Sequence, residues 1–409
     1  MQRRSFFQNS LLGAAAFSFL PQLKIAAETN TEPLPSWPLP DLKKILPDKI
    51  LIESVELLQV EKYLLLVVRS KDQLGITQCN DRMPHLVSLL KGLVLPHFVG
   101  FDARDVAQLV DNAYRLNSNY KYAGMPLWNC IGSVEIAIWD LLGRMAQKPV
   151  HQLLGTALRS SYPVYISDWN REGDPLQIVE SLQQKLKATG AKGVKIKIGG
   201  RMVNTAENAA QTQRYIPALR KGLGDNITIY ADANGSYTVT EGIEAGRLLE
   251  DHGVAIFEEP CNFEDEEGMR QVTKALKKIV LAGGEQDSSV FRFRRLAQTK
   301  VYDLLQPDLY YNGGILRTLQ VSLIASQYGL KGIAPHTPKA DPLIAPFWQV
   351  AALVPNLYGL QEFVYDVKAV RPNWCSKVEA KNGQVEIPVR PGLGIEYDGA
   401  VLEKAQRIG

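Results

Sequence analysis

The stretch from residue 193 to residue 284 contains four short runs of β-branched and apolar residues: GVKIKIG (193–199), ITIYAD (227–232), VAIFEE (254–259) and IVLAGG (279–284). Such runs, alternating with amphipathic stretches, are typical of parallel strands covered by helices. Similar runs extend the series on both sides: PVYIS (163–167), YDLLQP (302–307), KGIAPH (331–336) and LYGLQEF (357–363). Eight strands at a spacing of about 25 residues predict a parallel α/β barrel of the TIM type over residues 161–363.

The residues before the barrel predict a smaller α+β domain over 49–160. Two β-rich runs (50–60 and 63–70) flank Glu61-Lys62 in the manner of a hairpin, and a weaker run covers residues 75–79. Helical periodicity predicts helices over 83–95, 104–116 and 127–146. We expect residues 364–409 to pack back on this domain.

The first thirty residues have the order of an export leader. The twin arginine Arg3-Arg4 precedes an apolar run over 11–20, and small residues follow near Ala27. The run is shorter than the roughly 20 residues of a membrane-spanning helix. Residues 1–27 are therefore predicted to be a twin-arginine-like signal peptide for the periplasm, with an ordinary secretory leader or a disordered basic tail as alternatives. The prolines of residues 28–48 predict an extended linker.

The composition excludes several classes of protein. The 46 basic and 43 acidic residues give a net charge of +3, too small for a nucleic-acid-binding surface. With 45% hydrophobic and 22% charged residues, the chain is neither disordered nor collagen-like. The four cysteines lack paired spacing, which excludes a CxxC zinc site and favours buried thiols, and leaves open whether any of them pair. They are Cys79, Cys130, Cys261 and Cys375.

Carboxylates end three successive predicted strands. Asp232, Glu258 and Glu285 follow one another at 26 and 27 residues, so they should meet at the carboxyl ends of the barrel strands. Three like charges in a desolvated pocket require a cation or raised pKa values. Oxygen ligands favour Mg²⁺, with Mn²⁺ possible, and ion pairing with lysines is the alternative. Strand alternation predicts that only one of Glu258 and Glu259 faces the interior.

Lys195 and Lys197 lie two residues apart on one predicted strand, so both side chains should leave the same face. Two adjacent ammonium groups depress each other's pKa, which predicts a lysine that acts as a base near neutral pH. The same pattern is common at solvated strand edges, and only the position at the barrel mouth favours function.

His336 and Asp308 follow neighbouring predicted strands. The carboxylate would accept a hydrogen bond from the imidazole, orient the ring and raise its basicity, which gives a second candidate base on the opposite side of the mouth. The remaining histidines show no HxH or HExxH spacing and are predicted to be structural. They are His85, His97, His151 and His252.

Taken in order, these motifs resemble the mandelate racemase subgroup of the enolase superfamily over essentially the whole chain after the leader. They are KIK (195–197), DAN (232–234), EEP (258–260), GGEQ (283–286), QPD (306–308), PH (335–336) and QE (361–362). The resemblance implies a modified, enolase-like barrel with an N-terminal capping domain. The implied roles are Mg²⁺ ligation for Asp232, Glu258 and Glu285, acid/base chemistry for Lys197 and for His336 with Asp308, and substrate contact for Lys195, Asn234 and Glu362.

Two details qualify the resemblance. Lys195 would either tune the pKa of Lys197 or contact the carboxylate of the substrate. Gln286 stands where such proteins often have Asn or Ser, which alters the surroundings of the third ligand but not the ligand itself.

This residue set suits Mg²⁺-dependent removal of the proton next to a carboxylate, through an enediolate. Loss of a β-hydroxyl as water would give a 2-keto-3-deoxy acid, and the resemblance favours such an acid-sugar dehydratase, a lyase. A racemase, epimerase or cycloisomerase acting on a hydroxy or amino acid derivative is the runner-up. A non-catalytic exported binding protein for acid sugars is a further alternative, as is a metal-dependent hydrolase, whose usual histidine ligands are missing.

Substrate specificity is expected to come from capping-domain loops near 72–82 and 118–128. Their polar and aromatic groups suit a hydroxylated substrate, although surface exposure explains them equally well. These groups are Arg82, Tyr120, Lys121, Tyr122 and Trp128. The expected partners are a small carboxylate substrate and further copies of the chain in a homo-oligomer, with no nucleic acid and no stable membrane span.

Overall fold

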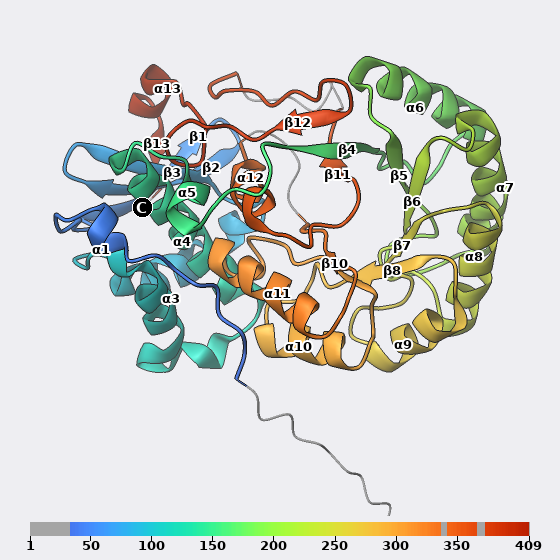
Figure 1. The fold of residues 1–409 in the computed structure, drawn as a ribbon, viewed down its shortest axis with the longest axis horizontal. Helices are drawn as coiled ribbons and strands as arrows, with labels where there is room; N and C mark the ends of the chain where they lie inside the picture. Colours follow the sequence, from blue (N-terminus) through green and yellow to red (C-terminus); the bar gives the residue numbers. More distant parts are fainter. Residues whose placement is uncertain (1–32, 337–341, 366–372, 409) are drawn as a thin grey trace, which may run out of the picture. The chain divides into compact units, whose positions relative to one another are not determined.

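Eight parallel strands curl into a barrel in the computed structural model, which describes residues 33–336, 342–365 and 373–408 (Figure 1). From the first strand to the seventh, each strand pairs with the next one along the chain, and the eighth pairs with the first. A parallel bridge between Ile333 and Leu357 closes the ring. The predicted barrel is thereby confirmed. Its strands are β4 (Ser161–Ser167), β5 (Gly193–Lys197), β6 (Thr228–Asp232), β7 (Ile256–Glu258), β8 (Val280–Gly283), β9 (Leu304–Leu305), β10 (Gly332–Ile333) and β11 (Gln361–Phe363).

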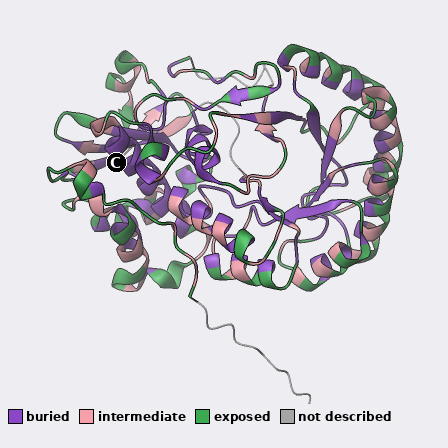
Figure 2. Cartoon of the chain, viewed as in Figure 1, coloured by how far each residue is buried: buried purple, intermediate pink, exposed green. Residues whose placement is uncertain are grey.

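Helices alternate with these strands and cover the outside of the barrel (Figure 1). The strands are buried on both faces, whereas α6 to α9 expose their outer faces, which explains why the strands read as continuous apolar runs (Figure 2). The helices are α6 (Pro175–Thr189), α7 (Ala206–Leu223), α8 (Val239–Asp251), α9 (Glu266–Ala275), α10 (Val290–Gln298), α11 (Ile315–Gln327) and α12 (Ala345–Leu353).

The N-terminal domain is built on an antiparallel sheet of order β13-β1-β2-β3. The predicted hairpin is present, and residues near the end of the chain add the edge strand β13, with Leu58 paired to Arg407. The strands are β1 (Ser54–Val60), β2 (Tyr63–Ser70), β3 (Gln73–Gln78) and β13 (Gln406–Arg407), and β12 (Gln384–Glu386) pairs with β4 on the barrel.

Two of the three helices predicted in this domain are continuous, and the first is not. Pro84 and Pro96 lack an N–H and fit best in a first helical turn, so residues 83–97 form successive short turns instead of one helix. The turns are η1 (Met83–His85), α2 (Val87–Leu89), η2 (Leu90–Val94) and η3 (Leu95–His97). The other elements are α1 (Leu42–Ile45), η4 (Ala103–Asp105), α3 (Val106–Arg115), η5 (Leu116–Tyr122), α4 (Met125–Met145), α5 (Val150–Leu154) and α13 (Gly399–Glu403).

The buried helix α4 connects the N-terminal domain to the barrel through one carboxylate. Glu135 accepts hydrogen bonds from the backbone N–H groups of Ile315 (2.9 Å) and Leu316 (3.1 Å) at the start of α11, and from Trp139 Nε1 (2.8 Å). The approach requires glycine at Gly314, where φ is 106° and a Cβ would lie 2.2 Å from Glu135 Oε2. Glu135 therefore caps a barrel helix from the other domain.

Glu135→Gln is expected to lower the free energy of unfolding by about 1 to 3 kcal/mol, because an amide offers only one accepting oxygen to these donors. Burial raises the pKa of Glu135 to about 7, although the three hydrogen bonds oppose the rise. The unfolded value is roughly 4.3, so the folded state holds an extra proton between these values. The stabilisation that comes from this extra proton is complete below the unfolded pKa and is lost as pH rises through the folded pKa.

The deficit of Glu135→Gln relative to the parent protein should therefore be larger near pH 5 than near pH 8, as measured by chemical denaturation. Glu244→Gln, at an exposed position on α8, is the matched control. If Glu135→Gln lowered the free energy of unfolding equally at both pH values, the raised pKa of Glu135 in the folded state would be contradicted.

The predicted signal peptide (1–27) lies outside the described residues, as does the start of the linker. The described part of the linker contacts the fold, because Trp37 Nε1 donates to the Leu154 carbonyl (3.0 Å) and Gln320 donates to the Pro35 carbonyl (2.8 Å). In the part of the chain that the structure describes, the four cysteines are buried and no disulfide joins them. Over the same residues, no helix has both the length and the apolar character of a membrane span.

Candidate active site

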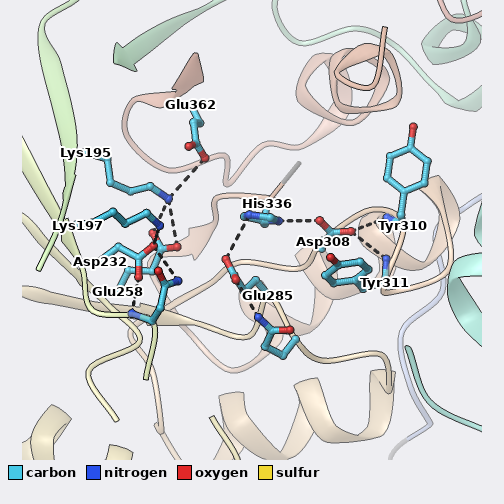
Figure 3. A network of polar contacts seen from close by, with 12 residues as sticks. Lys195, Lys197, Asp232, Glu258, Glu285, Asp308, Tyr310, Tyr311, His336 and Glu362 are labelled. Carbon is cyan, nitrogen blue, oxygen red and sulfur yellow. Dashed lines mark hydrogen bonds and ion pairs between the residues drawn. The ribbon is translucent and has the colours of Figure 1, made fainter. Parts of the chain in front are cut away.

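The candidate active site lies at the carboxyl ends of the barrel strands, as predicted. Lys197 at the end of β5 is in register with Asp232 at the end of β6, which is in register with Glu258 at the end of β7. A bridge joins Asp308 to His336 directly after β9 and β10. Because parallel strands end at one edge, these side chains gather there (Figure 3).

Two buried lysines neutralise carboxylates on one side of the site. Lys197 forms an ion pair with Asp232. Lys195 Nζ lies 3.0 Å from Glu258 Oε2 and 3.5 Å from Glu362 Oε2, so one ammonium group bridges two strands (Figure 3). The same ammonium group lies 5.8 Å from the centroid of the Tyr165 ring. These contacts fix Lys195 as a cation beneath the mouth of the barrel.

The prediction that neighbouring lysines depress each other's pKa is wrong for Lys195. Burial favours the neutral amine, but the carboxylates of Glu258 and Glu362 outweigh it and raise the pKa of Lys195 well above its ordinary value. The spacing of the two lysines in the sequence predicts that they are neighbours. It does not predict that Glu258 and Glu362, which lie on other strands, also contact Lys195. Lys195 is thus suited to bind a carboxylate and not to remove a proton.

On the other side of the site, a carboxylate fixes the orientation of the imidazole. Asp308 Oδ2 lies 2.6 Å from His336 Nδ1, and Asp308 Oδ1 accepts hydrogen bonds from the backbone N–H groups of Tyr310 (2.8 Å) and Tyr311 (2.9 Å). The other ring nitrogen, Nε2, lies 3.3 Å from Glu285 Oε2. The predicted contact between Asp308 and His336 is therefore present, and it directs Nε2 away from Asp308 toward the centre of the site (Figure 3).

The three predicted metal ligands lie on adjacent strands, but each faces a different cationic group or imidazole. Asp232 contacts Lys197, Glu258 contacts Lys195 and Glu285 contacts His336. Within the described ranges, no three Asp, Glu, His or Cys side chains lie close enough together to hold a metal ion. The carboxylates therefore meet at the mouth of the barrel as predicted, but in the described residues the lysines and the imidazole, and not a shared metal-binding arrangement, compensate their charges.

The chemistry of the donors still suits a hard divalent cation. Burial and the charges of Asp232 and Glu285 raise the pKa of Glu258, against the opposing effect of Lys195. Repulsion among carboxylates that share one mouth is relieved by a cation with oxygen ligands such as Mg²⁺. The residues fit Mg²⁺ if they turn from their present partners, so metal ligation stays a prediction.

Glu259 does not follow simple strand alternation. Strand β7 ends at Glu258, and Glu259 has a φ of 41° and is only 3% exposed. Burial and the charges of Glu285 and Asp232 raise the pKa of Glu259 well above its usual value. The backbone thus leaves the strand between the two glutamates, and the expectation that only one of them, Glu258, faces the barrel interior stays a prediction.

Asn234 holds Asp232 and is itself held by an arginine. Its backbone N–H donates to Asp232 Oδ1 (2.8 Å) and its side-chain amide to Oδ2 (3.2 Å). Arg171 donates from Nη2 to Asn234 Oδ1 and from Nη1 to the Ile198 carbonyl (2.7 Å). Asn234 lines the cavity described next, so it can contact a substrate as predicted while it orients Asp232.

A cavity of about 840 Å³ opens above these groups, between the barrel mouth and the N-terminal domain. This size accommodates a small metabolite. Its lining includes Lys62, Asn80, Asp81, Arg82, Trp169, Arg171, Lys197, Arg201, Asn234, Glu285, Tyr311 and His336.

Of the five side chains predicted to confer specificity, Arg82 lines the cavity. Trp128 is buried in the core instead, stacked on Tyr114 (centroids 4.8 Å apart) and under the guanidinium of Arg317 (3.6 Å). The exposed side chains of Tyr120, Lys121 and Tyr122 belong to η5 and are not among those that line the cavity.

Sequence reasoning missed Trp169, Arg171 and Arg201, which line the cavity from the segments after β4 and β5. Their positions in the sequence could have indicated a role in the cavity, because each lies within four residues of the carboxyl end of a barrel strand. Segments at this edge contribute active-site groups in βα barrels.

Comparisons with known proteins agree with this geometry. Residues 177–401 match the family described as enolase C-terminal domain-like, and residues 54–155 match the mandelate racemase / muconate lactonizing enzyme N-terminal domain. Arabinonate dehydratase of Saccharolobus solfataricus is 26% identical over 327 residues, covering 80% of this chain and 84% of that protein. D-galactarolactone cycloisomerase of Agrobacterium fabrum is 28% identical over 314 residues, 74% of this chain and 80% of that protein.

A solved structure extends the similarity to three dimensions. The mandelate racemase/muconate lactonizing protein of Paracoccus denitrificans complexed with magnesium superposes with a TM-score of 0.81 at 25% identity, covering 88% of this chain and 99% of that one.

Proposed function

The chain belongs to the mandelate racemase and muconate lactonizing enzyme family of the enolase superfamily, and from this we propose that it dehydrates a sugar acid to a 2-keto-3-deoxy acid. One observation carries the proposal: Lys197 and His336, the latter oriented by Asp308, lie on two sides of the mouth and both line one cavity. An α-hydrogen of a bound acid would lie between a lysine and an oriented imidazole. The similarity to arabinonate dehydratase supports dehydration over the other reactions of this family.

The residues of the chain first place the substrate. Lys195, held as a cation by Glu258 and Glu362, attracts the carboxylate of the substrate, and Glu362 can accept a hydrogen bond from a protonated oxygen or hydroxyl. Removal of the α-proton adds a second negative charge to that carboxylate, so donors and cations around it lower the barrier. Asp232, Glu258 and Glu285 would hold Mg²⁺, which would supply further positive charge to stabilise the developing dianion.

The two sides of the site then move protons. Lys197 Nζ or His336 Nε2, whichever faces the α-hydrogen, removes it, and the C–H electron pair enters the enediolate. A protonated group on the site donates a proton to the β-hydroxyl, the C–O bond breaks, and water leaves. The resulting enol tautomerises to the 2-keto-3-deoxy acid, so one water is lost and no oxidant is needed.

A racemase, epimerase or cycloisomerase is the second candidate, favoured by the same pair of flanking groups. If the second group reprotonates the α-carbon from the opposite face, the configuration inverts and no water is lost. The similarity to D-galactarolactone cycloisomerase supports this alternative.

Incubation of the purified protein with Mg²⁺ and a panel of aldonic and aldaric acids in deuterium oxide tests the proposal. Mass spectrometry should show loss of one water from at least one acid. Deuterium uptake at the α-carbon without loss of water would instead establish an isomerase. Neither change with any acid in the panel would point to a binding protein without turnover.

We further propose that residues 1–27 direct export to the periplasm and that the chain assembles into homo-oligomers. Fusion of residues 1–30 to a reporter that matures only in the cytoplasm and remains fluorescent after folded export tests the first proposal. Periplasmic fluorescence that is lost on Arg3-Arg4→Lys-Lys is expected, whereas cytoplasmic retention of the original fusion would contradict it.

A further inference from the structure

Basic side chains outnumber acidic ones on the cavity wall above the proposed reaction centre. Lys197 and Glu285 are occupied by Asp232 and His336. Among the described residues, the other charged side chains that line the cavity are Lys62, Arg82, Arg171 and Arg201, against the single acid Asp81. The described part of the wall therefore keeps an excess of positive charge after these two ion pairs are set aside.

Two of these arginines lie next to each other. Arg171 follows β4 and Arg201 follows β5, two strands that pair directly. Burial lowers the pKa of Arg171, and the nearby charge of Arg201 lowers it further, whereas Asp232 opposes the shift. Two guanidinium groups at this separation repel each other, and an anion between or above them would relieve the repulsion.

The two arginines differ in how their donors are used. Arg171 gives its terminal nitrogens to Asn234 and to the backbone carbonyls of Ile198 and Gly199. The Arg201 side chain is exposed and makes no hydrogen bond or ion pair with the residues that the structure describes. Its planar set of donors is thus available for a carboxylate, which guanidinium groups bind through two parallel hydrogen bonds.

We propose that Arg201, beside Arg171, binds a second carboxylate of the substrate, so that the preferred substrate is a sugar diacid and not a sugar monoacid. The inference rests on the proposed function and names its substrate class. The reacting carboxylate lies toward Lys195 and Glu362, and Arg201 lies past the carboxyl end of β5, beyond Lys197. Lys197 and Arg201 both line the cavity, whose volume of about 840 Å³ is enough for a six-carbon acid.

The test compares two acids that share the galacto configuration and differ only at the far carbon, galactarate with a carboxylate there and D-galactonate with a hydroxymethyl group. The measured quantity is the ratio of kcat/KM for the diacid to that for the monoacid. A charged hydrogen-bonding partner is worth about 10- to 100-fold, so the parent protein should prefer the diacid by at least tenfold. Arg201→Ala should lower the ratio by about the same factor, and Arg201→Lys should lower it less, because it keeps the charge but loses the planar fork.

Arg214→Ala is the matched control, since Arg214 is an exposed arginine on α7 that does not line the cavity. It should leave the ratio as it is. A parent protein that dehydrates monoacids as well as diacids would overturn this inference and leave the proposed function standing. The inference would also be overturned if Arg201→Ala left the ratio unchanged. A fall in the ratio for Arg82→Ala as large as the fall expected for Arg201→Ala, with Arg201→Ala itself unaffected, would overturn it as well. If neither class of acid loses water across the full panel of configurations, the proposed function fails and the inference fails with it.

Discussion

Lys197→Ala is expected to lower net turnover by about 10²- to 10⁴-fold, the usual contribution of a positioned acid or base. Lys197 lines the cavity at the end of β5, and its ammonium group pairs with Asp232. Removing it takes away one of the two groups that can reach the α-hydrogen. His336→Asn should cause a loss of the same order on the other side, because Asn cannot replace an imidazole in proton transfer.

The two variants should differ in proton exchange. One of them should still exchange the α-hydrogen with deuterium, since the base on the remaining side is intact, and which one does so identifies the base that acts first. Lys192→Ala, at an exposed position immediately before the same strand, is the matched control and should keep full activity. Full activity in Lys197→Ala or in His336→Asn would remove that residue from the mechanism.

Removal of divalent metal ions is expected to reduce activity to background, and added Mg²⁺ should restore it. In the structure the carboxylates of Asp232, Glu258 and Glu285 contact Lys197, Lys195 and His336. Binding of a cation must therefore compete with these contacts, and titration calorimetry should detect Mg²⁺ binding that weakens in Asp232→Asn. Asp225→Asn, at an exposed position just before β6, is the matched control and should bind Mg²⁺ like the parent protein.

EDTA saturated with Mg²⁺ beforehand controls for effects of the chelator itself and should leave activity intact. Full activity after exhaustive chelation, with metal content verified by elemental analysis, would exclude the metal site. In that case the ion pairs of the structure would represent the working state of the carboxylates.

The barrel and most of its active-site residues could be predicted because both depend on local pattern. A parallel strand buried on both faces gives a continuous apolar run, and its carboxyl end lies at the functional edge. Asp232, Asp308 and His336 were identified in this way, from their positions directly after such runs.

The features that could not be predicted depend on partners from distant segments. The charge state of Lys195 follows from Glu258 and Glu362, which lie on other strands. Trp128 belongs to a helix that is apolar on most faces, so the sequence pattern did not show that its ring packs under Arg317. The position of Arg201 depends on the path of a loop after β5, and no periodicity encodes that path.

The pairing of β13 with β1 has a consequence for biosynthesis. Gln406 and Arg407 pair with Gln59 and Leu58 of β1, so this edge of the sheet stays uncovered until residues 406–407 have left the ribosome. A nascent chain normally folds its N-terminal unit first, and an exposed strand edge in that interval invites pairing with other chains. The edge of β1 at Leu58 and Gln59 can therefore be covered only after residues 406–407 have been synthesised, and until then its backbone groups are open to pairing with other chains.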